Sequence, residues 1–499
     1  MDFVNAHILS ILVFFPVISA VLVMLLPMKS ARNLILLATF LTVLEFVFSL
    51  HLTAHFANSG SYEFMELIPW IKTFNINYFM GIDGVSLWLI LLTTFLTPLV
   101  FLGSLTSIIK RPKEFVVCML LLQAGMVGVF CALDLFLFYV FWEVMLIPMY
   151  FIIGIWGGDN RVYAAIKFFI YTMTGSVLML IAILWLYFKA NHSFNLMELY
   201  ELSLTPYEQY WLFLAFALAF AIKVPLFPFH TWLPDAHVQA PTAGSVILAG
   251  VLLKMGTYGF YRFAMPLFPH ALLELQVWLI GLAVIGIVYG ALVAMVQTDI
   301  KKLIAYSSVS HLGVVMLGLF SLDKTAMLGG LYQMLNHGIS TGALFLMVGM
   351  LYERTHSREI SQHGGLAHTA PWFVTIFLVV TFSSIGLPLT NGFVGEFLSL
   401  VGTFRTFEWA AIIGATGVIL SAIYMLWLAQ RVFFGPLKTP HDMKVTDINM
   451  REVFVMIPLL VMIVWMGVAP NCFLKWMDRP VDQLILQMQP TDIKASAVK

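Results

Sequence analysis

The sequence is poor in charge. Only 10% of its 499 residues are Asp, Glu, Lys or Arg, whereas a soluble domain carries about 25%. Acidic and basic residues number 26 each, so the formal net charge is zero and no basic surface for nucleic acid is expected. Hydrophobic residues make up 61% of the chain, and the mean hydropathy is +0.93. This composition predicts a polytopic membrane protein.

Cysteine and phosphate-binding signals are also scarce. The three cysteines, Cys118, Cys131 and Cys472, are far apart and lack the spacing of a metal or iron–sulfur site. No Gly-rich phosphate loop follows a strand-like run. We therefore expect neither a metal nor a redox cofactor in this chain.

Long apolar runs are what the sequence has in abundance. Each run is about 20 residues, which is enough to cross a bilayer as a helix. The fourteen runs lie near 7–27, 33–56, 85–107, 115–133, 134–155, 164–188, 210–228, 242–261, 273–297, 303–320, 326–350, 372–400, 408–430 and 452–470. The chain is predicted to be all-α, with residues 1–499 forming a single membrane domain. The first run has no cleavage site and is expected to stay in the protein.

Lys and Arg are distributed unequally between the two sides. Loops after odd-numbered runs carry 15 of the 26, and the opposite side carries 9. Because Lys and Arg are enriched in cytoplasmic loops, the loops after odd runs are predicted to be cytoplasmic. An even number of spans then places both termini on the periplasmic side.

Two of the runs contain helix breakers. Pro225 and Pro228 interrupt the seventh run just after Lys223, and a segment at 386–392 with two glycines and a proline interrupts the twelfth. Broken helices in corresponding positions are typical of inverted-repeat transporters. The predicted units are N-terminal helices 1–110, five-helix repeats 115–261 and 273–430, and a last helix with its tail, 452–499.

Several charges lie deep inside the predicted spans, where a charge is costly and usually functional. Glu143 in the fifth span and Lys223 in the seventh are predicted to form an ion pair that acts as a proton switch. The alternative for Glu143 is a protonated or hydrogen-bonded structural carboxyl. Lys254 has no proline beside it and is a candidate proton store, because burial favours a neutral lysine that can take up and release a proton.

Other titratable groups extend this set. Glu396 follows the second break, and its alternative role is a helix-end acid that faces water. His311 and His337, in the tenth and eleventh spans, are either proton relays or structural histidines. Glu45 is assigned a structural or peripheral role. His230 and His237 flank a predicted turn at 231–237 and lack a convincing third metal ligand.

The motifs of the chain resemble those of a known family. The matching stretches are Gly81–Leu87, Thr231–His237, Pro241–Ser245, Lys301–Ser308, Leu335–Gly338 and Asn391–Phe397. They resemble the antiporter-like subunits of the proton-pumping NADH:quinone oxidoreductase, respiratory complex I. Among these subunits, subunit M, which is chain 4 in mitochondria, carries a glutamate at the position that matches Glu396. In this respect the chain resembles subunit M.

The resemblance implies a proton path through Glu143, Lys223, Lys254 and Glu396, with His311 and His337 matching the family's two membrane histidines. It also implies a fourteen-helix fold with two inverted five-helix repeats. FMN, iron–sulfur clusters and quinone would belong to partner subunits, and the sister subunits L and N would be neighbours in the lipid bilayer. A bacterial inner membrane is the favoured location.

Other interpretations remain open from the sequence alone. One is the corresponding chain of a multisubunit cation/proton antiporter, and another is the equivalent chain of a ferredoxin-dependent relative. A third is a passive scaffold that joins neighbouring subunits. Four deep charges argue against the scaffold, because each of them costs stability.

Overall fold

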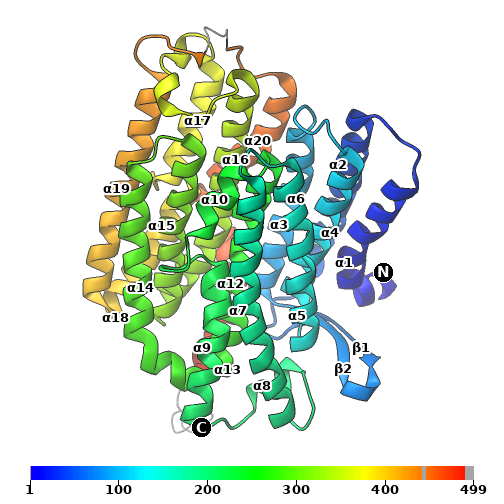
Figure 1. Cartoon of the computed structure of the whole chain (residues 1–499). Helices are drawn as coiled ribbons and strands as arrows, with labels where there is room; N and C mark the ends of the chain where they lie inside the picture. The colour runs from blue at the N-terminus through cyan, green and yellow to red at the C-terminus, as the bar shows by residue number, and fades with distance from the viewer. Residues whose placement is uncertain (1, 441–444, 489–499) are drawn as a thin grey trace.

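The computed structural model describes residues 2–440 and 445–488, which form a bundle of helices along one long axis (Figure 1). Twelve helices in this part are long and apolar enough to cross a membrane. The prediction of an all-α polytopic membrane protein is thus confirmed. The two remaining predicted spans, 210–228 and 372–400, are the broken ones, and the count of fourteen stays a prediction.

The helices follow the order of the predicted spans. The N-terminal helices are α1 (Asp2–Leu25), α2 (Ala31–His55) and α3 (Gly84–Gly103). Next come α4 (Pro112–Cys131), α5 (Leu135–Val144), α6 (Leu146–Trp156), α7 (Arg161–Lys189), α8 (Leu196–Tyr200), α9 (Pro206–Lys223), α10 (Trp232–Gln239), α11 (Thr242–Ile247), α12 (Leu253–Gly259) and α13 (Met265–Leu267). The remainder are α14 (Pro269–Met295), α15 (Ile300–Phe320), α16 (Lys324–Thr355), α17 (Pro371–Ser384), α18 (Asn391–Thr406), α19 (Glu408–Phe433), α20 (Met450–Val468) and α21 (Asn471–Met488).

One connection is not helical. In the predicted loop 57–84, β1 (Glu63–Ile71) pairs antiparallel with β2 (Ile76–Ile82) and forms a hairpin at one end of the bundle (Figure 1). The turn between them includes Asn75, whose φ of 51° suits the left-handed conformation that asparagine tolerates.

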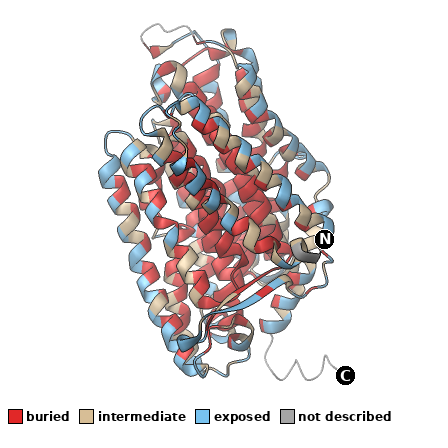
Figure 2. Cartoon of the chain, turned by 90° about the vertical axis from the view of Figure 1, so that its right-hand side faces the viewer, coloured by how far each residue is buried: buried red, intermediate tan, exposed pale blue. Residues whose placement is uncertain are grey.

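Buried residues fill the middle of the bundle, and exposed residues cover its outer helices (Figure 2). The most apolar stretches of α16 and of the α11–α13 span are completely buried, and that of α15 is 94% buried. In α7 and α19 only 39% of the most apolar stretch is buried. The helices predicted to carry Lys254, His311 and His337 are therefore central, while α7 and α19 offer apolar outer faces to lipid.

Both predicted breaks are confirmed. Helix α9 ends at Lys223, because Pro225 has no N–H to continue the helix. The carbonyl of Ala221 does not lose its partner, since Leu226 N donates to it at 2.7 Å. In the second break, α17 ends at Ser384 and α18 begins at Asn391, with Gly386 at φ +74° between them.

One local prediction was wrong, and one confirmed span has an irregularity that was not predicted. Residues 231–237 are not a turn, because Trp232–Gln239 forms helix α10. Pro234 fits there because it occupies the first turn, where its missing N–H would have no partner in any case. The fifth predicted span is confirmed as Leu135–Trp156, with a local irregularity at Met145 because α5 ends at Val144 and α6 begins at Leu146. Pro148 cannot donate to the carbonyl of Val144, which favours an interruption at that point.

Both ends of the described chain lie at the hairpin end of the bundle. The ring of His51, near the end of α2, is 2.6 Å from Asn5 in α1. Arg479 and the backbone of Lys475, both in α21, contact Asn58 just beyond α2. This arrangement fits an even number of crossings. Lys444, Lys494 and Lys499, which entered the charge count, lie outside the described residues.

Candidate functional site

Glu143 and Lys223 lie within electrostatic range of each other at two helix breaks, but no direct ion pair joins them in the structure. Lys223 is the last residue of α9 and is 1% exposed, and its Nζ has no hydrogen bond to the described residues. It lies 5.3 Å from the ring centre of Trp142 and 5.6 Å from that of Phe168, so aromatic faces supply part of its electrostatic stabilisation. Glu143 is half-buried, one residue before the end of α5, and its carboxylate acts electrostatically on Lys223.

Lys254 is completely buried between two π-helical turns. Helix α12 carries it, and the turns Leu248–Leu252 and Phe260–Ala264 precede and follow that helix. Such turns are rare and occur frequently at functional sites. The Nζ of Lys254 donates to the carbonyl of Ala249 and lies 2.7 Å from Nδ1 of His337. His337, one of the two predicted relay histidines, is therefore in direct contact with Lys254, the predicted proton store.

Helix α12 also packs tightly on the end of α9. A Cβ added at Gly256 would lie 2.8 Å from the carbonyl oxygen of Phe220 and 2.9 Å from the N of Val224. Only glycine permits this approach, because any larger residue would push the helices apart. The glycine thus fixes the Lys254 helix against the break that follows Lys223.

His311 and Glu396 form the second direct contact. Nδ1 of His311 lies 2.7 Å from Oε1 of Glu396, and their side chains are 6% and 5% exposed. Gln333 donates to the same carboxylate oxygen at 3.1 Å. Gly386 lies against the other oxygen, because a Cβ there would be 3.3 Å from Oε2. The second broken helix therefore encloses the carboxylate of Glu396.

The two histidines complete a row of four groups. The ring centres of His311 and His337 are 6.1 Å apart, and Nε2 of His337 is buried with no partner among the described residues. A cavity of about 10 Å³ lies against both rings and against Ser340 and Ser384. This volume suits about one water molecule, and the hydroxyls supply polar partners for it. Lys254, His337, His311 and Glu396 thus lie in sequence, with two direct contacts and one short gap.

Two residues near Lys254 are buried, and their burial was not predicted from the sequence. His237 is 0% exposed, stacks on Phe345 at 4.6 Å, and neither ring nitrogen has a hydrogen bond to the described residues. The ring lies within electrostatic range of Lys254 and Lys301. Lys301 was counted as a loop cation but is 5% exposed, and its Nζ donates to Ala240 O at 2.5 Å. The only signal in the sequence that could have indicated their burial was a titratable side chain close to a predicted span.

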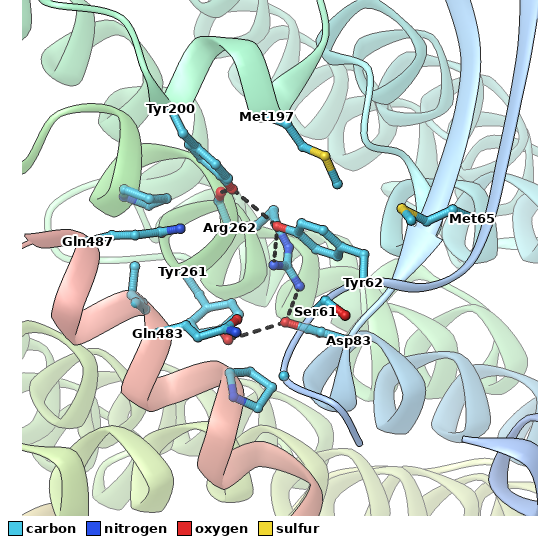
Figure 3. A pocket seen from close by; sticks show the side chains of 14 residues that line it. Ser61, Tyr62, Met65, Asp83, Met197, Tyr200, Tyr261, Arg262, Gln483 and Gln487 are labelled. Carbon is cyan, nitrogen blue, oxygen red and sulfur yellow. Dashed lines mark hydrogen bonds and ion pairs between the residues drawn. The ribbon is translucent and has the colours of Figure 1, made fainter. Parts of the chain in front are cut away.

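A further charged cluster lies at the hairpin end (Figure 3). Arg262, which was expected in a loop, is buried in the second π-helical turn and pairs with Asp83 at 2.5 Å. Its guanidinium also donates to Tyr62 at 2.8 Å and to Tyr258 at 3.1 Å. These bonds join residues from the start of α3, from the hairpin region and from the Lys254 span. A cavity of about 130 Å³ adjoins the cluster, but all three guanidinium nitrogens already have a partner within it.

Comparisons of the sequence identify relatives over nearly the whole chain. Residues 132–424 match the family described as NADH:quinone oxidoreductase/Mrp antiporter, and residues 9–128 match NADH-ubiquinone oxidoreductase chain 4, amino terminus. NADH-quinone oxidoreductase subunit M of Rickettsia prowazekii is 44% identical over 486 residues, covering 96% of this chain and 99% of the relative. NADH-ubiquinone oxidoreductase chain 4 of Arabidopsis thaliana is 44% identical over 479 residues, covering 96% and 97%.

Solved structures show the same fold. A chain of respiratory complex I from Thermus thermophilus with bound NADH superposes with a TM-score of 0.89 at 33% identity, covering 97% of this chain and 100% of that one. The membrane-bound sulfane sulfur reductase, an archaeal respiratory membrane complex, has a chain with a TM-score of 0.83 at 24% identity. That match covers 94% of this chain and 77% of the other, and it shows the fold alone.

Proposed function

The chain belongs to the family of NADH-quinone oxidoreductase subunit M, which is chain 4 in mitochondria, and we propose that it moves protons across the membrane for respiratory complex I. The names of its relatives favour this function over that of a free-standing cation/proton antiporter. Electron transfer from NADH to quinone takes place in other subunits, which hold FMN and the iron–sulfur clusters and bind quinone.

The row of four buried groups is the observation that carries this proposal. A proton enters near Glu143 and Lys223, is stored on Lys254, and passes through His337 and His311 to Glu396. Histidine can carry a proton on either ring nitrogen, so it passes protons in a row of hydrogen bonds. The gap of one water between the two rings can be bridged by hydrogen bonds without a large rearrangement.

The broken spans and the exposed hairpin set the surroundings of this path. Two inverted five-helix repeats, 115–261 and 273–430, place the two breaks in equivalent positions among fourteen spans. The hairpin and its turn expose five apolar side chains, each 50–60% exposed: Met65, Leu67, Ile68, Trp70 and Phe74. An uncovered apolar sheet edge tends to pair with other chains. These side chains suit contact with other membrane-arm subunits, and the sister subunits L and N are the proposed neighbours. The complex lies in a bacterial inner membrane with both termini of this chain in the periplasm.

The test is proton uptake by reconstituted vesicles, measured together with NADH oxidation. We expect Lys254→Ala to lower pumping at least tenfold, and Glu396→Ala to do nearly the same, because each removes a proton-holding group from the row. Glu396→Lys keeps a titratable group at that position and should retain part of the pumping. His270→Ala, on the surface of α14, is the control and should pump normally. Normal pumping by both alanine variants of the row would overturn the proposed path.

A further inference from the structure

A buried carboxyl lies in the N-terminal helices, outside the row described above. Glu45, in the middle of α2, is 0% exposed, and it interacts with the side chain of Gln123 in α4, which is also 0% exposed. None of the four side-chain oxygen and nitrogen atoms of this pair has a hydrogen bond of ordinary geometry within the described residues. The pair therefore forms an isolated polar contact between two membrane helices.

Within the described residues, no Lys or Arg acts on this carboxyl from the helices packed around it. Helix α3 contains no charged residue at all. The charged residues of α4 are Lys113 and Glu114 in its first turn, and α2 has Arg32 at its start and His51 and His55 toward its end. In α1, the titratable residues are near the start of the helix.

An ionised carboxylate with no cation partner is strongly disfavoured in such surroundings. The remaining polar neighbours on α2 are the hydroxyls of Thr42 and Ser49, which donate to backbone carbonyls in their own helix. The state that suits the site is a neutral carboxylic acid whose O–H donates to the side-chain carbonyl oxygen of Gln123.

The opposite face of α4 contacts the break beside Glu143. A Cβ added at Gly125 would lie 3.2 Å from Cβ of Met145 and 3.5 Å from the carbonyl oxygen of Phe141. Met145 is the residue between α5 and α6. Gln123 and Gly125 are two residues apart in a helix, so they point in directions about 200° apart. Helix α4 is thus held between Glu45 on one side and the interrupted fifth span on the other.

We propose that Glu45 is a positioning residue for the proton path. As a neutral acid it anchors α4 through Gln123, and α4 in turn supports the break beside Glu143, the predicted partner of Lys223. The positioning role rests on the proposed function, because it assumes that Glu143 belongs to the proton path. The neutral state of Glu45 does not depend on that function.

The test compares Glu45→Gln, Glu45→Ala, Gln123→Ala and the double alanine variant in the assembled complex. Because glutamine is neutral and of the same shape, Glu45→Gln should retain most of the ratio of protons pumped to NADH oxidised. The alanine variants should lose several-fold in this ratio, and the double variant should be no worse than either single one, because all three remove the same link. Glu274→Ala, on the exposed surface of α14, is the matched control and should behave as wild type.

Infrared difference spectra of wild type against Glu45→Gln give a second readout that does not depend on pumping. We expect the spectrum to lose a carbonyl band of a neutral carboxylic acid, and a lost carboxylate band instead would overturn the neutral acid. Glu45→Gln pumping as poorly as Glu45→Ala, or Glu45→Ala pumping normally while Glu143→Ala does not, would overturn the positioning role. Normal pumping by Glu143→Ala would instead count against the proposed path itself.

Discussion

At the scale of single residues, the sequence reveals the charges that lie deep in the predicted spans but not what they contact. Lys223, Lys254 and Glu396 stand out because each lies in an apolar run where a charge needs a reason. That His337 contacts Lys254 and His311 contacts Glu396 depends on helix packing, which a single sequence does not encode in any local pattern. The burial of His237 was not predicted, because its segment was interpreted as a turn.

The same scale gives a prediction for Glu143. Glu143→Ala removes the negative charge that favours the protonated form of Lys223, and we expect pumping to fall about tenfold while quinone reduction and assembly continue. Glu143→Asp keeps the charge and should retain part of the pumping. The measurement is proton uptake per NADH oxidised in vesicles. If Glu143→Ala pumped at the normal ratio, the pair would not be the switch.

At the scale of elements, breaks are predictable where proline or glycine marks them and difficult to predict elsewhere. Pro225 and Gly386 marked the breaks after α9 and α17, because each residue forces a backbone change at its own position. The interruption between α5 and α6 was missed, since Pro148 lies three residues beyond it. The two π-helical turns around Lys254 have no marker of this kind, because they arise from packing rather than from a residue that forces them.

Gly386 supports a prediction at this scale. Gly386→Ala places a side chain at φ +74°, which costs about 1–2 kcal/mol, and crowds the carboxylate of Glu396 at 3.3 Å. We expect lower thermal stability together with a several-fold loss of pumping. The control is Gly435→Ala, which has φ +86° but nothing within 4 Å of the added Cβ. It should lose similar stability and keep its pumping, whereas equal pumping by both variants would exclude a role for the crowding.

At the scale of the whole molecule, hydropathy and charge predicted the class and most of the helix boundaries. They did not predict the hairpin or α21 as ordered elements, because such segments are stabilised by packing against helices that are distant in sequence. The orientation in the membrane likewise rests on the bias of Lys and Arg, a statistical tendency and not a contact.

The orientation gives the prediction at this scale. A reporter fused before Met1 and one fused after Lys499 should both signal from the periplasm. A reporter inserted in the connection between α6 and α7, near Asp159, should signal from the cytoplasm. Enzymatic reporters that work in only one compartment measure this directly. Termini on opposite faces would show that the number of crossings is odd and that one predicted span is wrong.

The position of α21 has a consequence for biosynthesis. Phe473 accepts a hydrogen bond from Trp88, and the carbonyl of Trp476 lies so close to Gly84 that no side chain fits there. The ribosome makes α3 long before α21, so α3 must wait in the bilayer for this partner. Until α21 has been made, the start of α3 lacks this cover, and we expect quality-control proteases to reach it more easily. Synthesis that stops before Asn471 should therefore leave a short-lived product even though every residue of the proton path has been made.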